Sequence, residues 1–202
     1  MKTYFKLIGY LQEVLLTISV GILITLPIII VFKVGGISNI ATQKLYAASH
    51  IFLFFVMMIR PLADIFTKEK WIRPLVILRK GAGVFSASII VSFILAKLMV
   101  DPGGYITSLG TGAYWSLHNY ALFAHLADLS AIILIVTSNA FSKRVLGSWW
   151  KRIQKLSYVY FYGSALYVYL SYGSTDVLIM MILVTVVTLI AFIKNRLSEQ
   201  TV

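Results

Sequence analysis

Four residues of this chain have side chains whose chemistry stands out in an apolar sequence: His50, His118, His125 and Asp128. His118 and His125 are separated by two turns of an α-helix, so a continuous helix would present both on one face. Asp128 follows His125 by three residues and would lie on roughly the same face. Its carboxylate could accept the imidazole proton and so orient a ligating histidine, or it could take part in a proton path.

Each of these residues also has a structural interpretation. A histidine near the end of a membrane helix can hydrogen-bond a lipid headgroup or a backbone carbonyl without binding a ligand. An acid inside a span costs about 2.5–3.5 kcal/mol on insertion. Asp128 could offset that cost by remaining neutral, or by pairing with Lys97 or with a tyrosine. The sequence leaves both interpretations open.

A series of tyrosines in the last third of the chain has two interpretations as well. Tyrosines near either end of a span suit the aromatic belts of a bilayer. Those in the middle need partners for their hydroxyl groups, and they could line an electron route or contact another subunit. The series comprises Tyr158, Tyr160, Tyr162, Tyr167, Tyr169 and Tyr172.

The chain that must position these residues is strongly apolar. Of its 202 residues 59% are hydrophobic, and the mean hydropathy is +0.88. This composition predicts a protein whose solvent is the lipid bilayer. The lack of cysteine in the sequence excludes disulfides, iron–sulfur clusters and thiol chemistry. No hydrolase, ATP-binding or dinucleotide-binding motif occurs in it.

Apolar runs of about 20 residues predict an all-α integral membrane protein with six transmembrane helices. The first run is too long for a removed signal peptide, so we expect a retained helix. Residues 1–202 are therefore expected to form a single transmembrane domain. The expected spans cover approximately Val14–Phe32, Leu45–Phe66, Gly81–Val100, Trp115–Asn139, Leu156–Tyr172 and Val177–Ile193.

The distribution of positive charge predicts the orientation of these spans. The formal net charge is +11. If the N-terminus is cytoplasmic, all lysines and arginines except Lys33, Lys44 and Lys97 fall on the inner side, as the positive-inside rule requires. Both termini are thus expected to be cytoplasmic. The basic excess is explained by topology and by anionic lipid headgroups, so nucleic acid is not an expected partner.

Three segments carry a resemblance to a known family. TSNAFSKRVLGSWWKRIQKLSY (residues 137–158) joins the fourth expected span to the fifth, RPLADIF (60–66) ends the second, and LRKGAGV (78–84) enters the third. Together they resemble the ferric-reductase-like transmembrane family, most closely the haem-binding membrane subunit of the periplasmic methionine sulfoxide reductase system. The resemblance covers about residues 45–170. It implies that spans two to five form a four-helix, cytochrome-b-like bundle.

The same resemblance implies a b-type haem that carries electrons, its iron held by histidines on spans three and five. At the matching positions this chain has Gln154, Tyr167, and Ser92 or Phe93, so the family ligands are replaced. The chain's own histidines fall on spans two and four, the other diagonal of that bundle. A rotated haem b could then be held near the outer face by His50 and His125, with His118 as a substitute and Asp128 beside them.

Two hypotheses for the function remain open. The first is a membrane electron-transfer protein or oxidoreductase subunit that holds at most one haem. The second is a haem-free, non-catalytic structural subunit of a larger membrane complex. Both place the chain in the lipid bilayer of a prokaryotic cytoplasmic (inner) membrane. The expected partners are other membrane subunits or a soluble redox protein.

Overall fold

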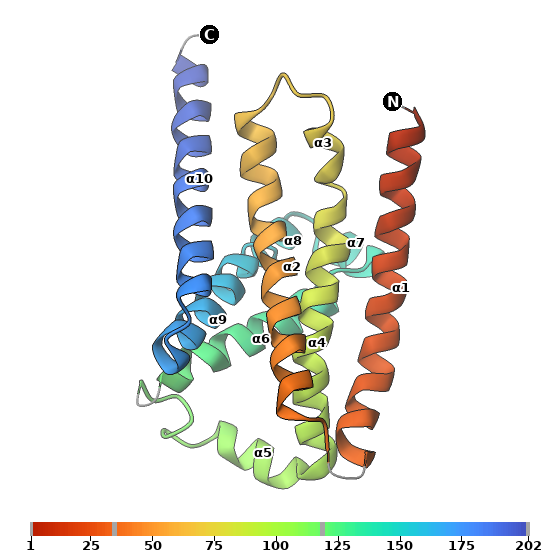
Figure 1. The fold of residues 1–202 in the computed structure, drawn as a ribbon, viewed down its shortest axis with the longest axis vertical. Coiled ribbons are helices and arrows are strands. Elements are labelled where there is room, and N and C mark those ends of the chain that lie inside the picture. Colours follow the sequence, from red (N-terminus) through yellow and green to blue (C-terminus); the bar gives the residue numbers. More distant parts are fainter. Residues whose placement is uncertain (1, 34–35, 118–119, 201–202) are drawn as a thin grey trace.

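The computed structural model describes residues 2–33, 36–117 and 120–200, and the regular structure within these ranges is entirely helical (Figure 1). Within them the helices follow in the order α1 (Lys2–Phe32), α2 (Asn39–Ile65), α3 (Ile72–Leu75), α4 (Leu78–Val100), α5 (Pro102–Leu109), α6 (Ala121–Thr137), α7 (Ala140–Leu146), α8 (Ser148–Ile153), α9 (Leu156–Tyr172) and α10 (Thr175–Gln200).

Four of the helices in the described ranges are long and apolar enough to cross a membrane. They are α1, α2, α10, and the run of α3 and α4 over Ile72–Val100. The pair of α6 and α7 makes a fifth if it is taken as one span with a 95° bend. α9 has 17 residues and a length of about 25 Å, against the ~30 Å of a typical hydrocarbon core. The prediction of several membrane-spanning helices is confirmed, and the number six stays a prediction.

Local side-chain contacts and glycines explain several helix ends. The Ser38 hydroxyl accepts a hydrogen bond from the backbone N–H of Ala41 at 3.3 Å and begins α2. The Asn139 side chain accepts one from the N–H of Ser142 at 2.7 Å and begins α7. Gly173 ends α9 with a φ of 65°, a left-handed conformation that glycine adopts without strain. α9 therefore has the bounds expected from the sequence.

The fourth expected span begins later than predicted. α6 starts at Ala121, whereas the sequence suggested a start near Trp115. Tyr120, directly before α6, has a φ of 58°, which is uncommon for a residue other than glycine and interrupts the helical path. Trp115 belongs to the preceding loop, where its indole Nε1 donates a hydrogen bond to the Leu109 carbonyl at 2.8 Å. A hydropathy pattern alone cannot detect this break, because the loop is also rich in apolar residues.

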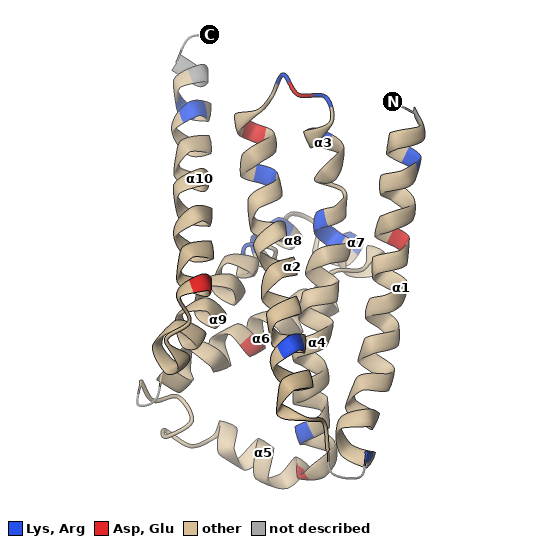
Figure 2. Cartoon of the chain, in the orientation of Figure 1, with Lys and Arg blue, Asp and Glu red and all other residues tan. Residues whose placement is uncertain are grey.

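The two ends of the molecule differ in charge. The start of α1, the α2–α3 loop and the end of α10 lie together at one end, which we call the terminal end (Figure 1). The end of α1, the start of α2 and α5 lie at the opposite end. Figure 2 shows basic residues on the α2–α3 loop at the terminal end, where Lys68 and Lys70 flank Glu69. α7 and α8 lie nearer the middle of the molecule in this view.

Four helices pack in a closed cycle that contains most of the core. α2 packs against α4, α4 against α6, α6 against α9, and α9 against α2. α1 covers α4, while α10 covers α2 and α9. α6 and α9 run obliquely behind α2 and α4 (Figure 1). The core side chains are Leu53, Met57, Ala87, Ile90, Val91, Ile94, Ala127, Ala131, Leu134, Tyr160, Phe161 and Val184.

Gly163 allows α9 to approach α6 closely. A Cβ atom at this position would lie 2.9 Å from the backbone oxygen of Phe123 and 3.5 Å from the Cβ of Ala127. Gly81 acts similarly between α4 and α1, where a Cβ atom would lie 3.1 Å from the Cβ of Leu15. Small residues at helix interfaces are the usual means by which membrane helices gain packing contacts, since lipid provides no hydrophobic drive for association.

Gly163→Ala is therefore expected to lower the free energy of unfolding by about 1–3 kcal/mol, because the new methyl group forces α9 away from the α6 backbone. The measurement is unfolding of the purified protein in mixed detergent micelles by titration with dodecyl sulfate. Gly21→Ala in α1 is the matched control, since a Cβ there would meet nothing within 4 Å. Equal effects of the two substitutions would contradict the close packing of α6 and α9.

Candidate functional site

A cluster of three hydroxyl groups lies at the centre of the four-helix cycle. The groups belong to Ser49 (α2), Ser86 (α4) and Tyr160 (α9). The Ser86 oxygen lies 3.0 Å from the Ser49 oxygen and 3.0 Å from the Tyr160 oxygen, and the Ser49 and Tyr160 oxygens lie 3.2 Å apart. The Ser49 hydroxyl also lies 3.1 Å from the Ser86 carbonyl, to which it can donate. None of the three residues is more than 2% exposed. Because an unpaired hydroxyl in apolar surroundings is costly, these bonds fix the relative depth of the three helices.

His50 provides a buried ring nitrogen on α2. Its Nδ1 lies 2.9 Å from the backbone carbonyl of Tyr46, one helical turn earlier. A carbonyl can only accept, so Nδ1 carries a proton, and in the neutral imidazole Nε2 then carries the lone pair. Nε2 is buried and has no hydrogen-bond partner within the described ranges. This imidazole is thus in the tautomer that a ligand to a metal or haem iron would need.

His125 lies on α6 beneath an aromatic loop. Its ring stacks on Tyr114 with a centroid distance of 3.4 Å and an interplanar angle of 13°, and the Trp115 ring lies 6.1 Å away, edge to face. Burial raises the pKa of Tyr114 most, and a hydrogen bond with Tyr105 and the negative charge of Asp128 raise it further. The phenol of Tyr114 therefore stays neutral at physiological pH. The Nδ1 of His125 is buried without a partner among the residues that the structure describes.

Asp128 lies among polar groups from the other three helices of the cycle. Lys97 of α4, Tyr46 of α2 and Tyr167 of α9 are all within electrostatic range of its carboxylate. In the described part of the chain, however, no hydrogen bond or ion pair reaches this carboxylate, and Arg60–Asp64 is the ion pair found there. Of the partners suggested from the sequence, neither Lys97 nor a tyrosine therefore bonds Asp128 directly. His118, the remaining candidate, lies outside the described residues.

The positions that the family resemblance assigns to haem ligands have other contacts here. The Phe93 ring stacks on Tyr46 with centroids 4.8 Å apart and an interplanar angle of 13°, which joins α4 to α2. The Ser92 hydroxyl bonds backbone carbonyls of Ile22 in α1 and Ser88, at 3.2 and 2.7 Å. Two further positions, Gln154 and Tyr167, contact Thr137 and Tyr172 respectively.

The donor chemistry for haem is present, but core side chains pack between the helices in the described part of the chain. The buried nitrogens of His50 and His125 belong to α2 and α6, which are diagonal in the cycle, as a shared haem between them would require. A porphyrin, however, needs a slot between the helices. Core side chains of α2, α4, α6 and α9 pack against one another inside the cycle. The residues described here therefore do not fit a haem in this packing.

The connection between α6 and α9 combines cations with tryptophan rings. The Lys143 ammonium lies 5.4 Å from the centroid of Trp150, and the Arg152 guanidinium lies 4.7 Å from that of Trp149. The indole Nε1 of Trp150 donates to the Thr137 carbonyl at 2.9 Å and so fastens α8 to the end of α6. Cations and amphipathic rings together are typical of segments at the lipid headgroups, whereas α7 and α8 lie nearer the middle of the molecule in Figure 1.

Sequence reasoning did not select the two serines of the hydroxyl cluster. It did predict that tyrosines in the middle of a span need hydroxyl partners. This is confirmed for Tyr160, with Ser49 and Ser86, and for Tyr162, which lies 2.9 Å from the Thr185 hydroxyl. Isolated serines inside apolar runs were the available signal, but nothing in the sequence pairs one run with another.

No family model, curated protein or solved structure matches this chain.

Tyr160→Phe removes one hydroxyl from the cluster and is expected to lower the free energy of unfolding by about 1 kcal/mol. A double-mutant cycle with Ser49→Ala, measured by dodecyl sulfate titration, should give a coupling energy of similar size. Tyr10→Phe is the control, because Tyr10 is 65% exposed on α1 and its hydroxyl makes no hydrogen bond in the described ranges. A coupling energy near zero would show that the three hydroxyls contribute no net stability.

Proposed function

We propose that this chain is a haem-free, non-catalytic subunit of a larger membrane complex in a prokaryotic cytoplasmic membrane. In this proposal the terminal end, with its basic α2–α3 loop, faces the cytoplasm in accordance with the positive-inside rule. In the same proposal α6 and α9 complete the six spans with the bilayer thinned locally around them, because a helix of 17 residues is shorter than a typical hydrocarbon core. The ancestor would be a cytochrome-b-like scaffold that has lost its ligands.

The proposal that the chain binds no haem is supported mainly by the packing of Phe93. Where the family resemblance expects an axial histidine, an aromatic ring stacks on Tyr46 of the neighbouring helix. The hydroxyl cluster of Ser49, Ser86 and Tyr160 occupies the centre of the same cycle. Both arrangements use the interior for helix–helix contacts, which is the role of a structural protein.

Asp128 supports the assignment to a larger complex. An ionisable group at membrane depth is costly unless it is paired or faces a cavity. Asp128 is half-buried and has no bonded partner in the described residues, although Lys97 is within electrostatic range. In this proposal a basic or hydroxyl group from another subunit reaches the exposed part of this carboxylate.

The electron-transfer hypothesis has one observation in its favour. Nε2 of His50 and Nδ1 of His125 are buried without partners among the described residues, and unpartnered imidazole nitrogens are characteristic of sites that await a ligand. Binding of haem b by these histidines would require the packed interior to open. We therefore rank this hypothesis second.

The two hypotheses differ in the visible absorption spectrum. The protein, expressed with added haem and purified, is expected to show no Soret band, because the interior has no slot for the macrocycle. A known b-type cytochrome produced in the same cells serves as the positive control. A Soret band that is lost in both His50→Ala and His125→Ala would overturn the proposal in favour of electron transfer.

The assignment to a complex is tested by the size of the native particle. In gently solubilised membranes of its own cells, the tagged chain is expected to migrate as a larger species on blue native gels. Asp128→Asn should reduce that species several-fold, because the acid is removed from the contact. Asp176→Asn, at the exposed start of α10, is the control. A wild-type chain that migrates alone would contradict the assignment.

A further inference from the structure

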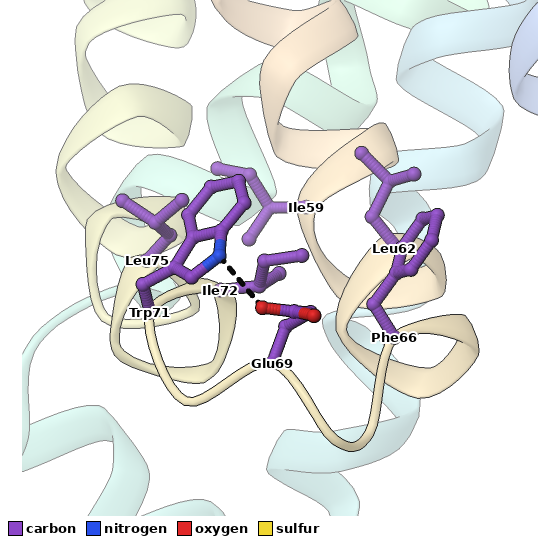
Figure 3. A pocket seen from close by; sticks show the side chains of 7 residues that line it. All are labelled: Ile59, Leu62, Phe66, Glu69, Trp71, Ile72 and Leu75. Carbon is purple, nitrogen blue, oxygen red and sulfur yellow. Dashed lines mark hydrogen bonds between the residues drawn. The ribbon is translucent and has the colours of Figure 1, made fainter.

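An apolar cavity of about 510 Å³ opens between α2 and α3 at the terminal end. Its lining residues are Ile59, Leu62, Phe66, Glu69, Trp71, Ile72 and Leu75. Figure 3 shows the side chains of α2 on one side of the cavity, those of Trp71 and Leu75 on the other, and Glu69 in the loop between them. This volume is within the ~300–1,000 Å³ typical of small-molecule sites.

The single acid of the cavity is already engaged. The indole Nε1 of Trp71 donates a hydrogen bond to the Glu69 carboxylate at 3.0 Å, drawn as the dashed line in Figure 3. The Tyr4 hydroxyl of α1 donates to the backbone carbonyl of Trp71 at 2.9 Å and so holds α3 in place. The side chain of Lys194 in α10 donates to the carbonyl of Ile65 at the end of α2. The rim is thus fixed from both sides, while the interior remains apolar.

Exposed cations are sequence neighbours of Glu69, Trp71 and Ile72, which line the cavity. Lys68, Lys70 and Arg73 are exposed, and none of them forms an ion pair within the described part of the chain. Trp71 is 58% exposed and Phe66 is 47% exposed, as expected for aromatic side chains at the level of the headgroups. An apolar cavity next to a basic loop is complementary to an amphiphile that has a negative head and a hydrocarbon tail.

We infer that this cavity binds one anionic phospholipid. An acyl chain enters between Leu62 and Trp71, and the phosphate lies against Lys68 and Lys70. Clusters of basic residues beside a membrane helix attract anionic headgroups by about 1 kcal/mol for each cation. The inference rests on the placement of the chain in a bilayer, and it is independent of whether the helix cycle binds haem.

Native mass spectrometry of the full-length protein in detergent tests the inference, with phosphatidylglycerol and phosphatidylcholine of identical acyl chains as probes. We expect phosphatidylglycerol to bind more tightly. Lys68→Gln combined with Lys70→Gln should weaken its binding about 30-fold, since each headgroup cation contributes roughly fivefold in affinity. Binding of phosphatidylcholine should not change.

Two further variants make the result specific to the cavity. Leu62→Trp fills it and should weaken both lipids. Lys33→Gln combined with Lys44→Gln removes two exposed cations at the opposite end and should leave the affinity unchanged. Equal binding of the two lipids by the wild-type protein, or an equal loss in the Lys33 and Lys44 variant, would overturn the inference. A dimer that dissociates in Leu62→Trp would overturn it in favour of a second copy as occupant.

Discussion

The packing of this protein depends on the need to satisfy polar groups within an apolar interior. Ser49, Ser86 and Tyr160 come from three helices, and each hydroxyl has the other two within hydrogen-bond distance. In lipid, a helix pair can slide or rotate at little cost if its interface is only apolar, because the tails of the lipid are as apolar as the side chains. The hydroxyl cluster removes that freedom. It sets the register of α2, α4 and α9. Gly163, which has no side chain, then allows α6 to pack closely against α9.

A helix bundle can be held together with or without a cofactor. A haem joins the helices of a bundle through iron–ligand bonds and through contacts with the macrocycle. Here the stacked rings of Phe93 and Tyr46 and the hydroxyl cluster join the same helices. In this packing, contacts between side chains join α2, α4 and α9. His50 and His125 lie on α2 and α6, which are diagonal in the cycle, and Nε2 of His50 and Nδ1 of His125 have no hydrogen-bond partner among the described residues.

Much of the fold was predictable from the sequence, and the reasons for the exceptions are physical. α9 has its predicted bounds because charged residues precede it and because Gly173, in a left-handed conformation, ends it. α1 begins well before the predicted Val14, because its first turns carry lysines that hydropathy assigns to a loop but that a helix end accommodates. α6 is shorter than predicted, since the left-handed Tyr120 breaks an otherwise apolar run.

The candidate site was less predictable. Residue type identified His50, His125 and Asp128 as unusual, but their neighbours depend on contacts between helices that are far apart in the chain. The stack of Tyr114 on His125 requires a loop to fold back over α6, and no periodicity in the sequence encodes that. The hydroxyl cluster joins residues that are up to 111 positions apart. Local patterns can show that a buried hydroxyl needs a partner, but they cannot show which helix provides it.

The bond from Lys194 to the carbonyl of Ile65 joins the last helix of the chain to the second. During synthesis α2 leaves the ribosome long before α10 does, so this carbonyl lacks its final partner until the C-terminal segment has been inserted. The N-terminal helices are thus inserted first, and the end of α2 gains its bond to Lys194 only after α10 has been inserted. A chain that stops before α10 would leave the carbonyl at the end of α2 without the Lys194 side chain that bonds it here.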